Sequence, residues 1–138
     1  MLASQIMLPL THSMPGPFDP TVFVVDDDPA VLGSLKFSLE TEGFRVRVFL
    51  TGRDLLSDGE ALPAAACLVV DYNLSGGNGL DLIAALRAKG NRLPAILITS
   101  HPSPEVRHRA QAAGVAVVEK PLLGNALSEA IHRALDGG

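Results

Sequence analysis

The sequence predicts an α/β fold in which a doubly wound, five-stranded parallel sheet is covered by five helices. Short apolar runs alternate along the chain with amphipathic stretches of helical period, and this alternation is typical of strand–helix–strand units. Three of the apolar runs contain almost no polar residue, as expected of strands buried on both faces of a parallel sheet.

The predicted elements alternate from residue 21 onward. The strands cover residues 22–25, 44–49, 67–70, 95–99 and 115–118. The helices cover residues 29–42, 51–56, 79–89, 104–113 and 125–135. Helix ends carry the usual signals, as in the first helix, which Pro29 opens and Gly43 ends. Thr51, with Asp54 at capping-box spacing, predicts the start of the second helix.

The second strand differs from the others. Residues 44–49 alternate between apolar and arginine side chains, which predicts a half-exposed strand at an edge of the sheet. Right-handed crossover connections leave few topologies. An edge strand in second place favours the flavodoxin-like strand order 2-1-3-4-5.

Composition indicates one globular domain without a membrane span. The 138 residues are 47% hydrophobic and 19% charged, which is enough to bury a core. No apolar run approaches the roughly 20 residues that cross a bilayer, and a net charge of −4 argues against direct contact with nucleic acid. The single cysteine, Cys67, excludes an internal disulfide and predicts a buried thiol in a reducing compartment. We therefore expect a cytoplasmic protein without membrane contact.

The chain divides into two parts. Residues 1–20 are rich in proline and show no sustained period, which predicts a flexible N-terminal tail. Residues 21–136 contain the predicted strands and helices and are expected to form the folded domain.

Polar residues whose side chains can bind ligands or react follow the predicted strands. Asp26 and Asp27 come after the first strand, Asp71 after the third, Thr99 ends the fourth, and Lys120 follows the fifth. Because ligands bind outside the carboxyl ends of the strands in such sheets, these side chains are expected to converge on one site.

The acidic run before Pro29 has two explanations. Its carboxylates can cap a helix and favour the positive end of the helix dipole, or they can hold a hard divalent cation. The other strand ends divide the run: Asp26 and Asp27 are predicted to belong to a cation site, and Asp28 to cap the helix.

Four segments together resemble a known family. They are Val-Val-Asp-Asp-Asp-Pro at residues 24–29, Asp71 at a strand end, Ile-Leu-Ile-Thr-Ser at 96–100 and Glu-Lys-Pro at 119–121. In this order and spacing they resemble the receiver domain of two-component response regulators, over residues 21–135. The resemblance implies a phosphoacceptor domain in a phosphorelay, which takes a phosphoryl group from a histidine kinase or a phosphotransfer protein and switches partner binding.

The resemblance also implies a magnesium site. Asp26 and Asp27 resemble the acidic pair that holds Mg²⁺, with Asp71 and the backbone carbonyl of Asn73 completing the protein ligands. Mg²⁺ prefers oxygen ligands and keeps several waters, which suits this set.

The remaining roles follow from the same resemblance. Asp71 resembles the phosphoacceptor, Thr99 the switch hydroxyl, and Lys120 the lysine that pairs with the phosphoryl group. The peptide bond between Lys120 and Pro121 is expected to be cis. Positioning and electrostatics dominate such transfers, and a compact ammonium suits a small anion. The domain would catalyse only its own phosphorylation and dephosphorylation.

The chain departs from the family at several positions. Val117 stands where an aromatic is usual, Ser75 replaces a usual proline, Ser100 replaces a smaller residue, and Leu122 stands where an aromatic is common. The glycine-rich segment 76–79 predicts a flexible loop. These departures suggest that a signal spreads through loop ordering rather than through an aromatic switch.

Other functions stay open at this point. A degenerate receiver could act as a phosphorylation-independent interaction or dimerisation module. An aspartyl phosphatase would use an Asp-x-Asp pair, which Asp26 and Asp28 match in spacing, but Pro29 follows directly. A flavin-binding domain is disfavoured because its first loop would offer backbone donors rather than carboxylates. The chain could be a stand-alone receiver or part of a longer regulator; the output partner is unknown, and a homodimer is one option.

Overall fold

The computed structural model of the chain describes residues 20–57 and 66–137. Within these ranges one parallel sheet has the strand order β2-β1-β3-β6-β7. Its strands are β1 (Thr21–Val25), β2 (Arg45–Phe49), β3 (Ala66–Asp71), β6 (Ala95–Thr99) and β7 (Ala116–Glu119). Counted along the chain, this is the order 2-1-3-4-5, so the predicted fold class and topology are confirmed.

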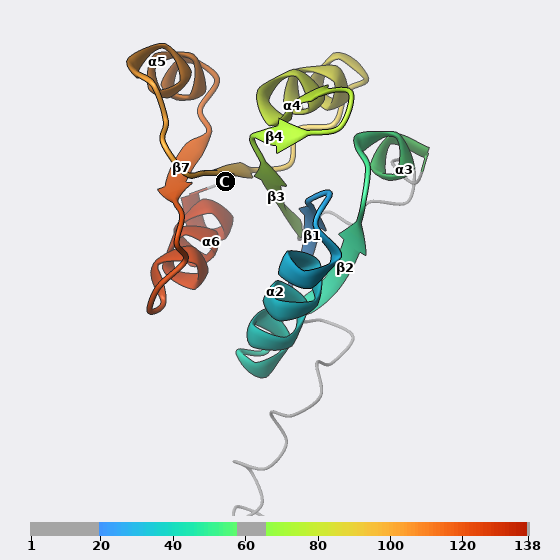
Figure 1. Cartoon of the computed structure of the whole chain (residues 1–138), viewed down its shortest axis with the longest axis vertical. Coiled ribbons are helices and arrows are strands. Elements are labelled where there is room, and N and C mark those ends of the chain that lie inside the picture. Colours follow the sequence, from blue (N-terminus) through green and yellow to red (C-terminus); the bar gives the residue numbers. More distant parts are fainter. Residues whose placement is uncertain (1–19, 58–65, 138) are drawn as a thin grey trace, which may run out of the picture.

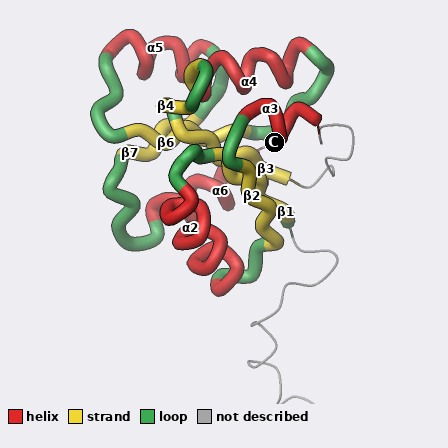
Figure 2. Tube along the Cα trace, turned by 45° about the vertical axis from the view of Figure 1, so that its right-hand side comes forward, coloured by secondary structure: helices red, strands yellow, loops and turns green. Residues whose placement is uncertain are grey.

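The helices form two layers, one on each side of the sheet. They are α2 (Pro29–Thr41), α3 (Gly52–Ser57), α4 (Gly79–Ala88), α5 (Pro104–Ala112) and α6 (Ala126–Gly137). Helices α2 and α6 cover one face, and α3, α4 and α5 cover the other (Figure 1). Figure 2 shows the same layers from a second direction.

The central strand β1 divides the core into two halves. All of its residues are buried, and successive side chains point to opposite faces of the sheet. Phe23 and Val25 pack in the cluster that includes the apolar face of α4. Val22 and Val24 pack in the cluster that includes the apolar faces of α2 and α6. The continuous apolar run is therefore explained by burial on both faces.

The two edges of the sheet are more exposed. Strand β2 alternates in part between exposed and buried residues, which confirms the predicted edge strand. Strand β7 at the other edge is half-buried to exposed throughout, because only β6 pairs with it.

Side-chain caps begin several helices as the sequence predicts. The Asp28 carboxylate accepts a hydrogen bond of 2.9 Å from the Ala30 backbone N–H. The Thr51 hydroxyl accepts one of 3.0 Å from the backbone N–H of Asp54. Asp28 is thus a helix cap, as expected.

Cys67 is fully buried in β3. Burial raises the pKa of its thiol to about 12, because the thiolate would lose its hydration. The predicted role as a small buried apolar side chain is confirmed.

A short hairpin follows β3. Strands β4 (Asn73–Leu74) and β5 (Gly77–Asn78) pair antiparallel, and the turn between them contains Gly76 at a φ of 85°. A positive φ is open to glycine at little steric cost. The sequence predicts a flexible loop here, and two-residue strands carry no alternation that could have indicated a hairpin.

Two other predictions concern the N-terminal tail and the membrane. The predicted tail, residues 1–20, lies outside the described residues except for Pro20. Among the helices within residues 20–57 and 66–137, none combines the length and the apolar character that a membrane crossing requires.

Gly79 joins the hairpin to α4 at a point of close contact. A Cβ atom at this position would lie 2.5 Å from the carbonyl oxygen of Asp71 and 2.8 Å from Cγ1 of Val70. The Gly79 backbone N–H donates a hydrogen bond of 2.8 Å to the carbonyl oxygen of Tyr72. The absence of a side chain therefore lets α4 begin directly against the end of β3.

Replacement of Gly79 by alanine should lower the free energy of unfolding by about 1–3 kcal/mol, because backbone atoms would have to move apart. Gly33→Ala is the matched control, since Gly33 lies exposed inside α2 and an added Cβ there would meet nothing within 4 Å. That variant should gain about 0.5–1 kcal/mol. Urea unfolding checks both values, and equal stability of the two variants would contradict the packing described.

Candidate functional site

The pairing of the strands aligns their carboxyl ends. Asp71 at the end of β3 pairs with Ile98 of β6, and Thr99, the next residue of β6, pairs with Glu119 of β7. Asp26 directly follows β1, whose last residue pairs with the residue before Asp71. Four neighbouring strands therefore bring the predicted site residues to the same edge of the sheet.

Three carboxylates meet at this edge. One oxygen of each of Asp26, Asp27 and Asp71 lies within 4.8 Å of the others. Asp26 and Asp71 are buried, with 1% and 5% of their surface exposed, whereas Asp27 is exposed. The structure thus brings together the three acidic residues that the sequence predicts to share a site.

A lysine ammonium group lies beside the carboxylates. Lys120 Nζ is 3.0 Å from Asp71 Oδ1 and 3.8 Å from Asp26 Oδ2. The side chain of Lys120 is 28% exposed, so water only partly screens its charge. Lys120 is therefore placed to stabilise negative charge on Asp71 directly.

The two oxygens of Asp26 have different surroundings. Oδ1 accepts a hydrogen bond of 2.9 Å from the backbone N–H of Asp28. Oδ2 is buried and has no hydrogen-bond partner among the described residues. A buried acceptor without a donor is costly, and a hard cation bound by the three carboxylates would satisfy it. The donor set, all of it oxygen, therefore fits Mg²⁺.

Burial governs the ionisation of the two inner carboxyl groups. Loss of hydration raises the pKa of Asp26, and the charge on Asp71 raises it further, while the backbone N–H of Asp28 and the Lys120 ammonium oppose the rise. Loss of hydration also raises the pKa of Asp71, against the opposing effect of Lys120. Ionising both inner carboxyl groups is therefore unfavourable, and when all three carboxyl groups are ionised a single lysine neutralises only part of their charge.

Thr99 and Asn73 are located by strand pairing and by sequence, not by a hydrogen bond to the carboxylates. Thr99 is buried at the end of β6, and Asn73 is exposed at the start of β4. The strand pairing places Thr99 at the edge where the carboxylates lie, and Asn73 follows Asp71 closely in sequence. Neither side chain makes a hydrogen bond to the carboxylates in the described part of the chain. The peptide bond between Lys120 and Pro121 is cis, as the resemblance implies.

A contact from the hairpin to the carboxylates was not predicted. The Ser75 hydroxyl donates a hydrogen bond of 3.2 Å to Asp27 Oδ2, across 48 positions of sequence. The sequence marks Ser75 only as a departure from the family pattern. A contact between residues so far apart leaves no local signal that could have revealed it.

Polar contacts also connect the hairpin to α4 and α5. The Asn78 side chain caps α4 through the backbone N–H of Asp81, and its amide nitrogen donates a hydrogen bond of 3.1 Å to Asp81 Oδ2. Arg109 of α5 reaches Asp81 Oδ1 at 2.5 Å. The spacing of Asn78 and Asp81 ahead of an apolar run is a capping signal that the sequence does contain.

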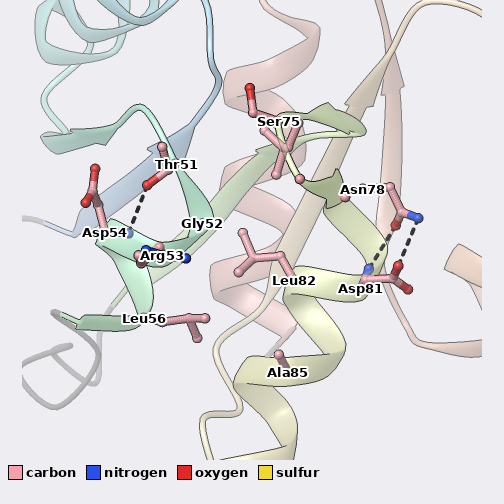
Figure 3. Close-up of a pocket in the computed structure, with 13 residues that line it drawn as sticks. Thr51, Gly52, Arg53, Asp54, Leu56, Ser75, Asn78, Asp81, Leu82 and Ala85 are labelled. Carbon is pink, nitrogen blue, oxygen red and sulfur yellow. Dashed lines mark hydrogen bonds between the residues drawn. The ribbon is translucent and has the colours of Figure 1, made fainter.

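An open cleft of about 660 Å³ lies beside the hairpin, between α3 and α4. Figure 3 shows Leu56, Leu82 and Ala85 along it, with Ser75 and Asn78 from the hairpin at one end. The hydroxyl of Ser75 points away from Leu82 and Ala85 in this view. Ser75 lines this cleft, whereas Asp27 is not among its lining residues.

Comparison with known proteins reveals one family by sequence. The model of the response regulator receiver domain matches residues 22–132. The transcriptional regulatory protein FixJ of Azorhizobium caulinodans is 34% identical over 115 residues, which are 83% of this chain and 54% of that protein. The response regulator protein TmoT of Ectopseudomonas mendocina is 33% identical over 115 residues, covering 83% of this chain and 52% of that protein. The chain thus spans about half the length of these relatives.

Solved structures show the same relationship. The crystal structure of FixJ-N superimposes with a TM-score of 0.78 at 31% identity, covering 86% of this chain and 94% of that chain. The chemotaxis protein CheY4 of Vibrio cholerae gives a TM-score of 0.76 at 22% identity, covering 84% and 98%. The latter likeness concerns the fold alone.

Replacement of Asp26 by asparagine should stabilise the metal-free protein at pH 7 by about 1–3 kcal/mol, because it removes a buried charge that faces Asp71. Burial raises the pKa of Asp26 above its ordinary value of 3.8, so the folded protein holds this proton more tightly than the unfolded chain does. The contribution of protonated Asp26 to the free energy of unfolding is fully present below pH 3.8. It is lost as the pH rises through the raised pKa of the folded protein.

The advantage of the Asp26→Asn variant should therefore shrink as the pH falls through the same interval. Urea unfolding in a chelating buffer at several pH values measures it. Asp136→Asn, at an exposed position of α6, is the control and should change the free energy of unfolding little at pH 7. A destabilised Asp26→Asn protein, or an advantage that does not depend on pH, would contradict this account.

Proposed function

Because this chain belongs to the response regulator receiver domain family, we propose that Asp71 accepts a phosphoryl group in a phosphorelay. The donor is a histidine kinase or a phosphotransfer protein, and phosphorylation switches binding to an output partner in the cytoplasm. The observation that carries the proposal is the contact of 3.0 Å between Asp71 and Lys120, beside two further carboxylates.

The transfer itself is a displacement at phosphorus. An oxygen of Asp71 forms a bond to phosphorus while the bond from phosphorus to the imidazole nitrogen of the donor breaks, and the released imidazole takes a proton from solvent. Asp71 must be ionised to attack, and Lys120 favours that form although burial opposes it. Lys120 then remains beside the phosphoryl oxygens, where its charge is worth more than in water.

The proposed magnesium ligands are Asp26, Asp27, Asp71 and the backbone carbonyl of Asn73. Bound there, Mg²⁺ supplies positive charge that neutralises the phosphoryl oxygens during transfer. Two features of the chain support this site: the buried Oδ2 of Asp26 without a donor and the raised pKa of both inner carboxyl groups. Each would be relieved by a cation at the centre of the cluster.

Thr99 is proposed as the residue that senses the phosphoryl group. Its hydroxyl is a rotatable donor at the end of β6, on the edge that carries Asp71. The backbone N–H of Lys120 donates a hydrogen bond of 2.9 Å to the carbonyl oxygen of Thr99. A movement of Thr99 toward the phosphoryl group would therefore also act on the segment that follows β7.

The proposed binding partner of the phosphorylated domain is inferred from the relatives. FixJ and the TdiR protein of Thauera aromatica are each named as a transcriptional regulatory protein, and this chain covers about half of each. We propose that residues 21–136 form the receiver unit and that its phosphorylated face binds an output domain, a partner protein or a second copy. A module without phosphorylation is not favoured, because the three carboxylates lie together and Lys120 lies beside Asp26 and Asp71.

Incubation with a small phosphodonor and Mg²⁺ should add the mass of one phosphoryl group to the protein. Asp71→Asn should show no adduct, because an amide is not a competent nucleophile for this transfer. Asp136→Asn, the matched exposed replacement, should be modified as the wild type is. Intact mass spectrometry reads all three. An unmodified wild type, or an equal adduct on Asp71→Asn, would refute the proposed function.

Magnesium should raise the melting temperature of the wild type, since it binds the folded chain in preference to the unfolded one. At a free Mg²⁺ concentration of 100 times the dissociation constant, the free energy of unfolding should rise by about 2.7 kcal/mol. Asp27→Asn should lose most of this gain, and Asp136→Asn should keep it. Differential scanning calorimetry with Mg²⁺ or chelator measures the difference; a similar gain in Asp27→Asn would exclude Asp27 as a ligand.

A further inference from the structure

We propose that Ser75 is a positioning residue for the metal site: its hydroxyl holds the Asp27 carboxylate in the orientation that binds the cation. This inference rests on the proposed function and adds to it a residue outside the proposed ligand set. The observation behind it is the hydrogen bond of 3.2 Å from Ser75 Oγ to Asp27 Oδ2.

Asp27 has a greater need of such support than the other two carboxylates. Asp26 is buried and held by the backbone N–H of Asp28, and Asp71 is buried and held by Lys120. Asp27 is exposed, so its side chain is not confined by packing. A ligand that must be ordered on binding lowers affinity, and an outer hydrogen bond that orders it beforehand restores affinity.

The hairpin brings the hydroxyl to this position. Ser75 lies between β4 and β5, and Gly76 at a φ of 85° reverses the chain directly after it. The pairing of Asn73 with Asn78 and of Leu74 with Gly77 fixes the two arms. One short hairpin therefore carries both the proposed carbonyl ligand, Asn73, and the hydroxyl that holds Asp27.

This arrangement links the metal site to helix α4. The hairpin continues without a break into α4, whose first turn is capped by the Asn78 side chain. Figure 3 shows Ser75 at one end of the hairpin segment and the bonds between Asn78 and Asp81 at the other. If Ser75 orders Asp27 for the cation, the bound cation in turn orders the hairpin, because the coupling between two sites is reciprocal.

The test compares Mg²⁺ binding by isothermal titration calorimetry for the wild type and three variants of the full chain. Ser75→Ala removes the hydroxyl and should raise the dissociation constant about 10-fold, the lower end of the effect of losing an outer partner of a metal ligand. Ser75→Thr keeps a hydroxyl and should stay close to wild type. Ser57→Ala is the control, because the Ser57 hydroxyl is exposed on α3 and bonds to the carbonyl oxygen of Arg53 instead.

A second measurement separates positioning from general support of the fold. The midpoint of urea unfolding in chelator should be the same for wild type and Ser75→Ala, because Ser75 is exposed. Equal Mg²⁺ affinity of wild type and Ser75→Ala would overturn the inference, as would weaker binding that Ser75→Thr fails to restore or that accompanies a loss of metal-free stability. A wild type that binds no Mg²⁺ would refute the proposed magnesium site itself.

Discussion

Repulsion between like charges is the constraint on which the site depends. Two unit charges within 4.8 Å of each other repel by at least about 3 kcal/mol at an effective dielectric constant of about 20. The parallel sheet nevertheless holds Asp26 and Asp71 within this distance, because each is anchored by a strand that is buried on both faces. Lys120 offsets part of the repulsion. Surplus negative charge at this edge is the basis of the cation site and of the phosphoryl transfer that we propose.

The surroundings of the cluster keep this arrangement in place. Gly79 lets α4 begin against β3, so the strand that ends in Asp71 and the helix meet without a side chain between them. On the solvent side the hairpin supplies Ser75 to the one exposed carboxylate of the cluster. Asp81 then joins the hairpin cap to Arg109 of α5. A change at the carboxylates thus has a route of direct contacts to two helices that does not depend on an aromatic at position 117.

The sequence was most informative where the structure depends on period and on strand ends. Buried apolar runs predicted the central strands, and the alternation in residues 44–49 predicted the edge strand. The convergence of Asp26, Asp71 and Lys120 followed from the rule that parallel strands end on one edge. The contact between Ser75 and Asp27 could not be predicted in this way, since it joins residues 48 positions apart through a hairpin too short to show a pattern.

The most direct test of the central claim is a crystal structure of the chain with Mg²⁺ and beryllium fluoride, which mimics a phosphoryl group. We expect beryllium bonded to one oxygen of Asp71 and its fluorides in contact with Lys120 Nζ and the Thr99 hydroxyl. The metal should be bound by Asp26, Asp27, the second oxygen of Asp71 and the carbonyl oxygen of Asn73, directly or through water. Beryllium fluoride on another residue, or a metal away from these carboxylates, would contradict it.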